Sequence, residues 1–334
     1  MKNAMLTPDA TADLIRSGAT LLVAGEESLL RALPAGNWIG GTSVYFLTEE
    51  GGCHDTTRLH VTQVEAATDS VIRHLGTEAL QDLTQGRFDG GISLVLIPAF
   101  SEAHSRFALE APAFPGLFEQ PLMGWITGVA LDEVGTKRPA VIDGSTGALH
   151  TEGAVVMHVE LPMDRQPDID ILNLFEQDMD PARHFTFDQT GFTATTATVN
   201  GQTVRLADYI AQQGIDTALP LVADYAGAMV NVSFQSVDAT TGEVRFYAPV
   251  VSGVDYRLAK PLPDYAATFV QRASGDGTRQ MSCNCILNYL HGQLEGKTTG
   301  SYTGPATFGE IAYMLLNQTM VRVDLKAASS AAVA

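Results

Sequence analysis

Three cysteines and the histidines nearest to them are the main metal-ligating candidates in the sequence. Cys283 and Cys285 are separated by one residue, and His291 follows them. The pair Cys53-His54 lies in the N-terminal part of the chain. If these regions meet in space, they supply a Cys₃His or Cys₂His₂ set of the kind that binds zinc. The C-x-C spacing is not the usual zinc spacing, however, and free cysteines are often simply buried.

Cys283 is also a candidate nucleophile. A catalytic thiolate needs a nearby base and a locally positive field. His291 supplies a candidate base, but the acidic composition of the chain opposes formation of the thiolate. The sequence therefore leaves a metal site, a catalytic thiol and a buried core thiol open for this residue.

Glycine-rich segments offer a different chemistry, the binding of an anion by backbone N–H groups. Gly40, Gly41 and Thr42 stand between two apolar segments, where such a nest could hold a carboxylate or a phosphate. The alternative is a tight turn that only glycine tolerates. Trp125, in a second segment of small residues, is a candidate pocket wall or a core residue.

Established catalytic motifs do not occur in the chain. Gly296-Lys297-Thr298 suggests a nucleotide-binding loop, but His291 stands where the first glycine of that motif belongs. The GxGxxG, HExxH and GxSxG patterns are absent. These absences argue against dinucleotide, zinc-peptidase and serine-hydrolase chemistry and leave other classes of enzyme open.

The elements that would position these residues alternate between helix and strand. In the first half we expect helices at 7–18, 26–32, 69–83 and 101–111. A continuous apolar run at 90–98 predicts a strand buried on both faces. The turn at 143–147 is expected to join strands 139–142 and 153–161 as a hairpin.

In the second half, residues 230–237 and 243–249 alternate like paired antiparallel strands. Helices are expected at 169–175, 263–273 and 308–316. The fold class is therefore α/β or, since hairpins are frequent, α+β, with two domains of mixed, partly antiparallel sheets flanked by helices.

Composition indicates where the domains divide and which partners are excluded. We expect domains at 1–165 and 183–326, an acidic connector at 166–182 and a disordered tail at 327–334. The 334 residues carry 20 Lys and Arg against 38 Asp and Glu, a net charge of −18. This balance argues against nucleic-acid and anionic-membrane partners. The polar N-terminus and three sparse cysteines favour the cytoplasm.

Several segments, read in chain order, resemble the FIST family of sensory proteins, which pair a FIST-N with a FIST-C part. In the first half these segments are LLVA at 21–24, IGGTS at 39–43, PLMGWITG at 121–128 and the hairpin segments 142–144 and 152–156. In the second half they are MSC at 281–283, FGEI at 308–311 and NQT at 317–319. The chain departs from the family pattern at Trp125, at Asn284-Cys285 and at Leu316.

The resemblance implies a cytoplasmic small-ligand sensor that lacks its own output domain and acts through a separate signalling protein. We expect the ligand, an amino acid or a related metabolite, to bind between the two halves. The expected ligand-binding residues are Gly40, Gly41, Thr42, Trp125, Cys283, Glu310 and Asn317. Glu310 would accept hydrogen bonds from an amine, or would alternatively begin a helix.

Two rival interpretations remain open. The first is an enzyme, or a zinc- or haem-binding protein, that uses Cys283 and Cys285, with Cys53 and His54 as further metal ligands. Haem would need an exposed axial His or Cys in an apolar pocket, and the sequence singles out none. The second is a homo-oligomer whose interface is the main product of the fold.

Overall fold

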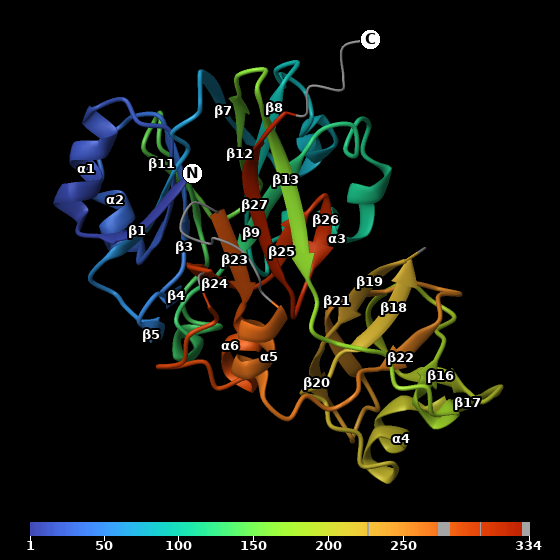
Figure 1. Ribbon diagram of the computed structural model, residues 1–334. Coiled ribbons are helices and arrows are strands. Elements are labelled where there is room, and N and C mark those ends of the chain that lie inside the picture. Colours follow the sequence, from blue (N-terminus) through green and yellow to red (C-terminus); the bar gives the residue numbers. More distant parts are fainter. Residues whose placement is uncertain (226, 273–280, 301, 329–334) are drawn as a thin grey trace. The chain divides into compact units, whose positions relative to one another are not determined.

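The computed structural model describes the chain except for residues 226, 273–280, 301 and 329–334 (Figure 1). Helices make up 19% and strands 43% of it, so the expected α+β class with mixed sheets is confirmed. The chain forms two compact units. Unit 1 comprises Met1–Leu172, Ala266–Leu315 and Met320–Ala334, and unit 2 comprises Asn173–Tyr265 and Leu316–Thr319.

The first sheet of unit 1 carries the N-terminal segment. Its strands, in spatial order, are β1 (Lys2–Leu6), β6 (Leu59–Gln63), β2 (Leu21–Gly25), β3 (Trp38–Thr42), β10 (Val141–Asp143) and β11 (Ala148–His150). Helix α1 (Pro8–Arg16) begins where the Thr7 side chain accepts a hydrogen bond from the Ala10 N–H. Its apolar face packs Ile15 into a core that includes Val23 and Trp38.

The second sheet surrounds the apolar strand expected at 90–98, which is confirmed as β8 (Gly91–Pro98). The order is β26 (Met314–Leu316), β25 (Glu310–Ala312), β9 (Leu122–Thr127), β8, β12 (Ala154–Glu160) and β7 (Asp69–Leu75). All residues of β8 after Gly91 are buried, as a strand covered on both faces requires. Helix α3 (Glu102–Glu110) follows it and is capped by Ser101.

Two helices expected in this sheet are strands instead. Residues 69–75 form β7, which pairs with β12 along its whole length, and only 77–82 are helical, as the 3₁₀ helix η1 (Thr77–Asp82). The spacing of Val71, Leu75 and Leu80 suggested one apolar helix face. In the structure Val71 is instead exposed on the edge strand β7. Residues 308–316 form β25 and β26, separated by Tyr313 at a φ of 63°. Glu310 therefore does not begin a helix.

The expected hairpin between 139–142 and 153–161 is also wrong. The turn after Asp143 joins β10 to β11, and β12 pairs with β7 and β8 in another sheet. The sequence shows that a turn is present here, but it does not show which strand is the partner, because β12 pairs with strands that are distant in the sequence.

The third sheet brings distant segments of unit 1 together. Its order is β13 (Arg165–Leu172), β27 (Met320–Ala327), β23 (Met281–Cys285), β24 (Gly304–Thr307), β4 (Tyr45–Thr48) and β5 (Gly51–His54). Figure 1 shows β27 between β13 and β23. The units are thus discontinuous in sequence, whereas we expected consecutive halves at 1–165 and 183–326.

The acidic segment expected to be a solvated connector contains strand β13, and the helix expected at 169–175 is wrong. All eight residues of β13 pair with β27. The carboxylates fit a strand because basic side chains of β27 meet them: Asp168 pairs with Lys326, and Asp170 pairs with Arg322 at 2.8 Å. Of the expected tail, Ala327 ends β27, and residues 329–334 lie outside the described part of the chain.

Unit 2 contains three small sheets and helix α4 (Leu206–Gln212). The first is β14 (His184–Phe185), β22 (Tyr256–Leu258), β18 (Leu221–Tyr225) and β19 (Ala228–Val232). The others are β15 (Gly191–Ala194), β21 (Val244–Val250) and β20 (Phe234–Val237), and the pair β16 (Thr196–Val199) and β17 (Gln202–Arg205). The antiparallel pairing expected between 230–237 and 243–249 is confirmed by β20 and β21.

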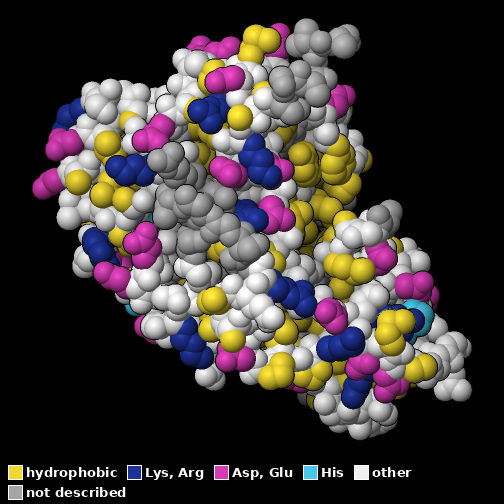
Figure 2. All heavy atoms as spheres, viewed as in Figure 1, with side chains coloured by type: hydrophobic (Ala, Val, Ile, Leu, Met, Phe, Trp, Pro, Cys, Tyr) yellow, Lys and Arg dark blue, Asp and Glu magenta, His cyan; other side chains and the backbone are white. Residues whose placement is uncertain are grey.

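The remaining helices are short. They are α2 (Glu27–Arg31), η2 (Ala111–Ala113), η3 (Leu131–Glu133), η4 (Pro181–Arg183), α5 (Tyr265–Arg272) and α6 (Ile286–His291). Among the described residues, no helix combines the length and the apolar character that crossing a membrane requires. On the face shown in Figure 2, basic side chains stand among acidic ones.

Candidate functional site

The glycines expected to form an anion nest lie inside a sheet. Gly40 and Gly41 belong to β3, which pairs with β2 on one side and β10 on the other. Thr42 ends the strand, and its hydroxyl exchanges hydrogen bonds with the backbone of Ala140 at 2.9 and 3.3 Å. This stretch is therefore a strand and not a turn, and its backbone is engaged on both sides.

Gly41 is required because other side chains pack closely against it. A Cβ at this position would overlap the Thr127 methyl group and would lie 3.3 Å from the Trp125 indole nitrogen. Trp125 Nε1 and Thr127 Oγ1 are buried and have no hydrogen-bond partner among the described residues. Gly41 and Trp125 thus meet in the interior of unit 1, where solvent does not reach them, and not in an open ligand pocket.

Cys283 and Glu310 join this interior cluster. Glu310 pairs with Trp125 across strands β25 and β9, and the Cys283 thiol lies 3.5 Å from the Gly124 carbonyl oxygen. Both side chains are fully buried. Burial, together with the negative charge of Glu310 and the neighbouring Cys285, raises the pKa of the Cys283 thiol well above its ordinary value. This environment opposes a thiolate nucleophile.

The cysteines do not converge on a metal site. Cys53 lies on β5 and Cys283 on β23, with strands β24 and β4 between them. Three strand spacings separate them by about 14 Å, whereas zinc binds each sulfur at about 2.3 Å. His54 instead stacks on Tyr45 at 4.9 Å. In the described parts of the chain, no group of three or more His, Cys, Asp or Glu side chains could hold a metal ion.

Asn317 belongs to unit 2, unlike the other expected ligand-binding residues. Its side-chain oxygen accepts hydrogen bonds from the Ser233 backbone N–H at 3.0 Å and the Ser233 hydroxyl at 2.7 Å. The Asn231 amide also donates to the Asn317 carbonyl oxygen at 3.2 Å. These bonds fix the segment Leu316–Thr319 to the neighbouring strands, which is a structural role.

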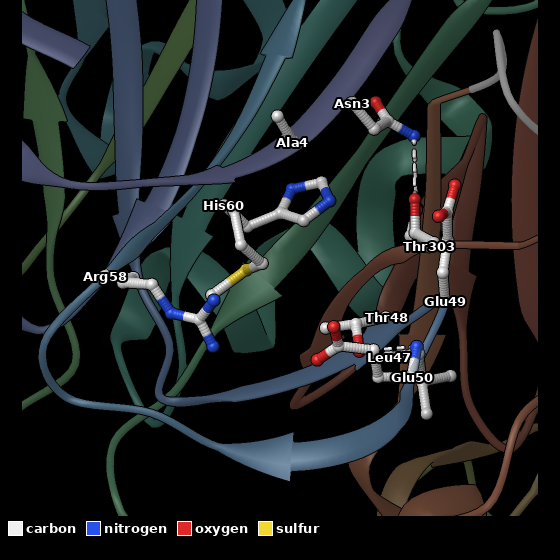
Figure 3. A pocket seen from close by; sticks show the side chains of 10 residues that line it. Asn3, Ala4, Leu47, Thr48, Glu49, Glu50, Arg58, His60 and Thr303 are labelled. Carbon is white, nitrogen blue, oxygen red and sulfur yellow. Dashed lines mark hydrogen bonds between the residues drawn. The ribbon is translucent and has the colours of Figure 1, made fainter. Parts of the chain in front are cut away.

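A cavity of about 300 Å³ in unit 1 presents an open polar surface (Figure 3). We call it the His60 pocket. Strand β1, the β4–β5 hairpin and the first part of β6 form its walls. Its polar residues are Asn3, Thr48, Glu49, Glu50, Arg58, His60 and Thr303. The volume is at the lower end of the range found for small-molecule sites.

His60 is the buried polar group of this pocket. Only 2% of its surface is exposed, and its Nε2 atom has no hydrogen-bond partner among the described residues. The ring stacks on Phe46 with the centroids 6.2 Å apart, and Figure 3 shows it directed toward the side that carries Asn3 and Thr303. Burial lowers the pKa of His60 from 6.5 to about 4, so the imidazole is neutral at pH 7.

Hydrogen bonds fix one wall of the pocket. The Asn3 amide nitrogen donates to the Thr303 carbonyl oxygen at 3.2 Å, and its oxygen accepts from the Thr62 hydroxyl at 2.9 Å. Residues 3 and 303 are thus held together, although they lie at opposite ends of the chain. A wall that is fixed before binding reduces the entropy that a ligand must overcome.

The charges around the pocket are unbalanced. Arg58 Nε donates to Asp55 at 2.7 Å. Hydrogen bonds from Thr57 and Arg58 outweigh the desolvation of Asp55 and lower its pKa to about 2, so it is ionised. Glu49 and Glu50, in the β4–β5 turn, form no ion pair within the described residues. The pocket therefore has an excess of negative charge.

A larger cavity of about 550 Å³ lies beside the start of α3, but two of its charged groups are engaged within the chain. Lys137 pairs with Glu26 at 2.6 Å and with Glu133 at 3.4 Å. Glu152 accepts a hydrogen bond from the Glu102 N–H at 3.1 Å. None of the described residues that line this cavity has a buried side-chain polar atom without a partner. We therefore assign the candidate site to the His60 pocket.

Ser93 and His158 form a buried pair that resembles part of a catalytic triad. The Ser93 hydroxyl donates to His158 Nδ1 at 2.9 Å, and Arg87 Nε donates to the same hydroxyl oxygen at 3.0 Å. Burial and the nearby Arg87 charge lower the pKa of His158 to about 4. The space beside the pair has a volume of about 0 Å³, so no substrate can reach it. The pair connects neighbouring strands.

Two features of the sequence point weakly to the His60 pocket. His60 interrupts the buried strand at 59–64, and Glu49-Glu50 marks the preceding turn. Neither feature shows that β1 and Thr303 complete the pocket, because that requires the pairing of segments from both ends of the chain. Of the residues expected to bind a ligand, Gly41, Trp125, Cys283 and Glu310 belong to the interior cluster and do not line the His60 pocket.

Comparison with protein families finds a match that covers most of the chain. Residues 6–326 match a family described as "Family of unknown function (DUF6976)". No curated protein matches the chain.

Proposed function

The chain belongs to the DUF6976 family, a family of unknown function, and we propose that it is a small-ligand-binding protein whose site is the His60 pocket. The further role that we propose is that of a cytoplasmic sensor that signals through a separate protein. The support for this further role is the ordered resemblance to FIST proteins.

One observation carries the binding proposal: a neutral, buried imidazole without a partner lines an open cavity. Buried polar groups in folded proteins are nearly always hydrogen-bonded, and leaving one unpaired costs about 1–3 kcal/mol. His60 Nε2 is such a group, and the cavity beside it has room for a small molecule. A ligand that hydrogen-bonds to His60 would recover that cost.

The pocket fits binding better than catalysis. His60 is neutral and a possible base, but its pKa of about 4 makes it a weak one at pH 7. The Cys283 thiol, the other candidate for chemistry, is buried and protonated. The pocket contains the groups that a binding role requires.

The experiment is a thermal-shift screen against a panel of amino acids, amines and small metabolites. The wild-type protein is compared with His60→Gln and with a matched control, Glu65→Gln. Glu65 is exposed and does not line the pocket. We expect a saturable rise in Tm for at least one compound in the wild type and the control, and a smaller rise in His60→Gln. A panel without any hit, or a hit unaffected by His60→Gln, overturns the proposal.

A further inference from the structure

The His60 pocket carries an excess of negative charge. Glu49 and Glu50 lie in one turn and, within the described residues, have no ion pair. Arg58, the cation of the pocket, is already bonded to Asp55. The charge of Glu50 also acts on Arg58 and helps to raise the pKa of its guanidinium, but this one cation, already bonded to Asp55, does not balance both glutamates. The remaining negative charge raises the local concentration of cations and repels anions.

A second, independent observation concerns hydrogen bonding. His60 is neutral at pH 7, and its Nε2 atom is buried without a partner. A neutral imidazole has one donor and one acceptor nitrogen, so it can accept a hydrogen bond from a ligand N–H. A positively charged imidazole could not accept one, and it would repel a cation.

The third observation is the apolar lining. Ala4, Met5 and Leu47 contribute to the wall between the polar groups. This surface suits a short hydrocarbon segment. The volume of about 300 Å³ admits roughly ten non-hydrogen atoms, if each takes about the space of a water molecule in the liquid.

We propose that the His60 pocket binds a small organic cation, a primary amine on a short hydrocarbon chain. Its ammonium group is held by Glu49 and Glu50, and a polar N–H or O–H group hydrogen-bonds to His60. This inference rests on the proposed ligand-binding function and specifies its ligand class. The two glutamates would repel the carboxylate of a zwitterionic amino acid, so the pocket should bind amines more tightly than amino acids.

Isothermal titration calorimetry with four probes tests the proposal: 1,4-diaminobutane, ethanolamine, glycine and sodium acetate. The proteins are the wild type, Glu49→Gln, Glu50→Gln and the control Glu65→Gln. We expect both amines to bind the wild type and the control at least 10-fold more tightly than glycine, and acetate not to bind. Since each charge-assisted hydrogen bond is strong, each pocket variant should weaken amine binding about 5- to 10-fold.

The outcomes separate the two proposals. If glycine or acetate binds as tightly as the amines, the pocket binds ligands but the cation inference fails. If amines bind equally well to Glu49→Gln, Glu50→Gln and the wild type, the inference also fails. If no probe binds and the panel screen has no hit, the ligand-binding function itself fails. The glutamates are exposed turn residues, so their variants should retain the fold.

Discussion

The buried state of His60 predicts a specific loss of stability in acid. The pKa of its side chain is about 4 in the folded protein and 6.5 when it is unperturbed. The unfolded chain therefore binds a proton at pH values where the folded chain does not. This contribution to the free energy of unfolding is fully present above pH 6.5, falls as the pH decreases from 6.5 to about 4, and is constant below that.

The magnitude follows from the two pKa values. Integrating the difference in proton binding between pH 7 and pH 5 gives a loss of about 2 kcal/mol for this one histidine. The variant His60→Gln has no titrating group at the position. Its overall stability is expected to be lower, but its loss between pH 7 and pH 5 should be smaller than that of the wild type by about 2 kcal/mol.

Urea unfolding at the two pH values measures this difference. The fluorescence of Trp38 and Trp125 reports on the transition, because both indoles are buried in unit 1. Other groups that titrate, such as His104 and His158, are present in both proteins, so the comparison isolates His60. Equal pH dependence in the wild type and in His60→Gln would refute the assignment of a buried, neutral imidazole.

Three further predictions concern the rest of the fold. Gly124→Ala should destabilise unit 1 by about 3 kcal/mol, because its Cβ would overlap the Val95 carbonyl oxygen; a change in Tm below 2 °C would contradict this. Iodoacetamide should leave Cys283 unmodified in the folded protein at pH 8 and modify it after denaturation, as mass spectrometry can show; modification of the native protein would be inconsistent with its burial. Asp170→Asn should cost less than about 1 kcal/mol in urea unfolding, since its ion pair with Arg322 is half-exposed, and a larger loss would indicate a tertiary role that we have not assigned.

Local signals allowed part of the fold to be predicted. The capping of α1 by Thr7 and Pro8 and the apolar run of β8 are fixed by neighbouring residues, and both were anticipated. Residues 69–75 and 308–316 were mistaken for helices because short strands can show apolar residues at helical spacing. Their true state depends on partner strands that are distant in the sequence.

The structure of the acidic segment 166–182 likewise depends on a partner strand that is distant in the sequence. Its Asp residues suggested a solvated connector, but Asp168 and Asp170 form ion pairs with Lys326 and Arg322 of a strand more than 150 positions away. The proposed site was missed for the same reason, because the contact between Asn3, in the first sheet, and Thr303, beside β24 of the third sheet, joins residues 300 positions apart. Residues expected to bind a ligand did gather, around Trp125 and Glu310, but in a closed interior.

The most direct test of the binding site is a titration followed at His60 itself. The protein is labelled with ¹⁵N-histidine, and the imidazole resonances are recorded as 1,4-diaminobutane is added at pH 7. We expect a saturable shift of the His60 Nε2 resonance, with little change at His184, which lies in unit 2. An unchanged His60 resonance at saturating diamine, or an equal shift at His184, would contradict it.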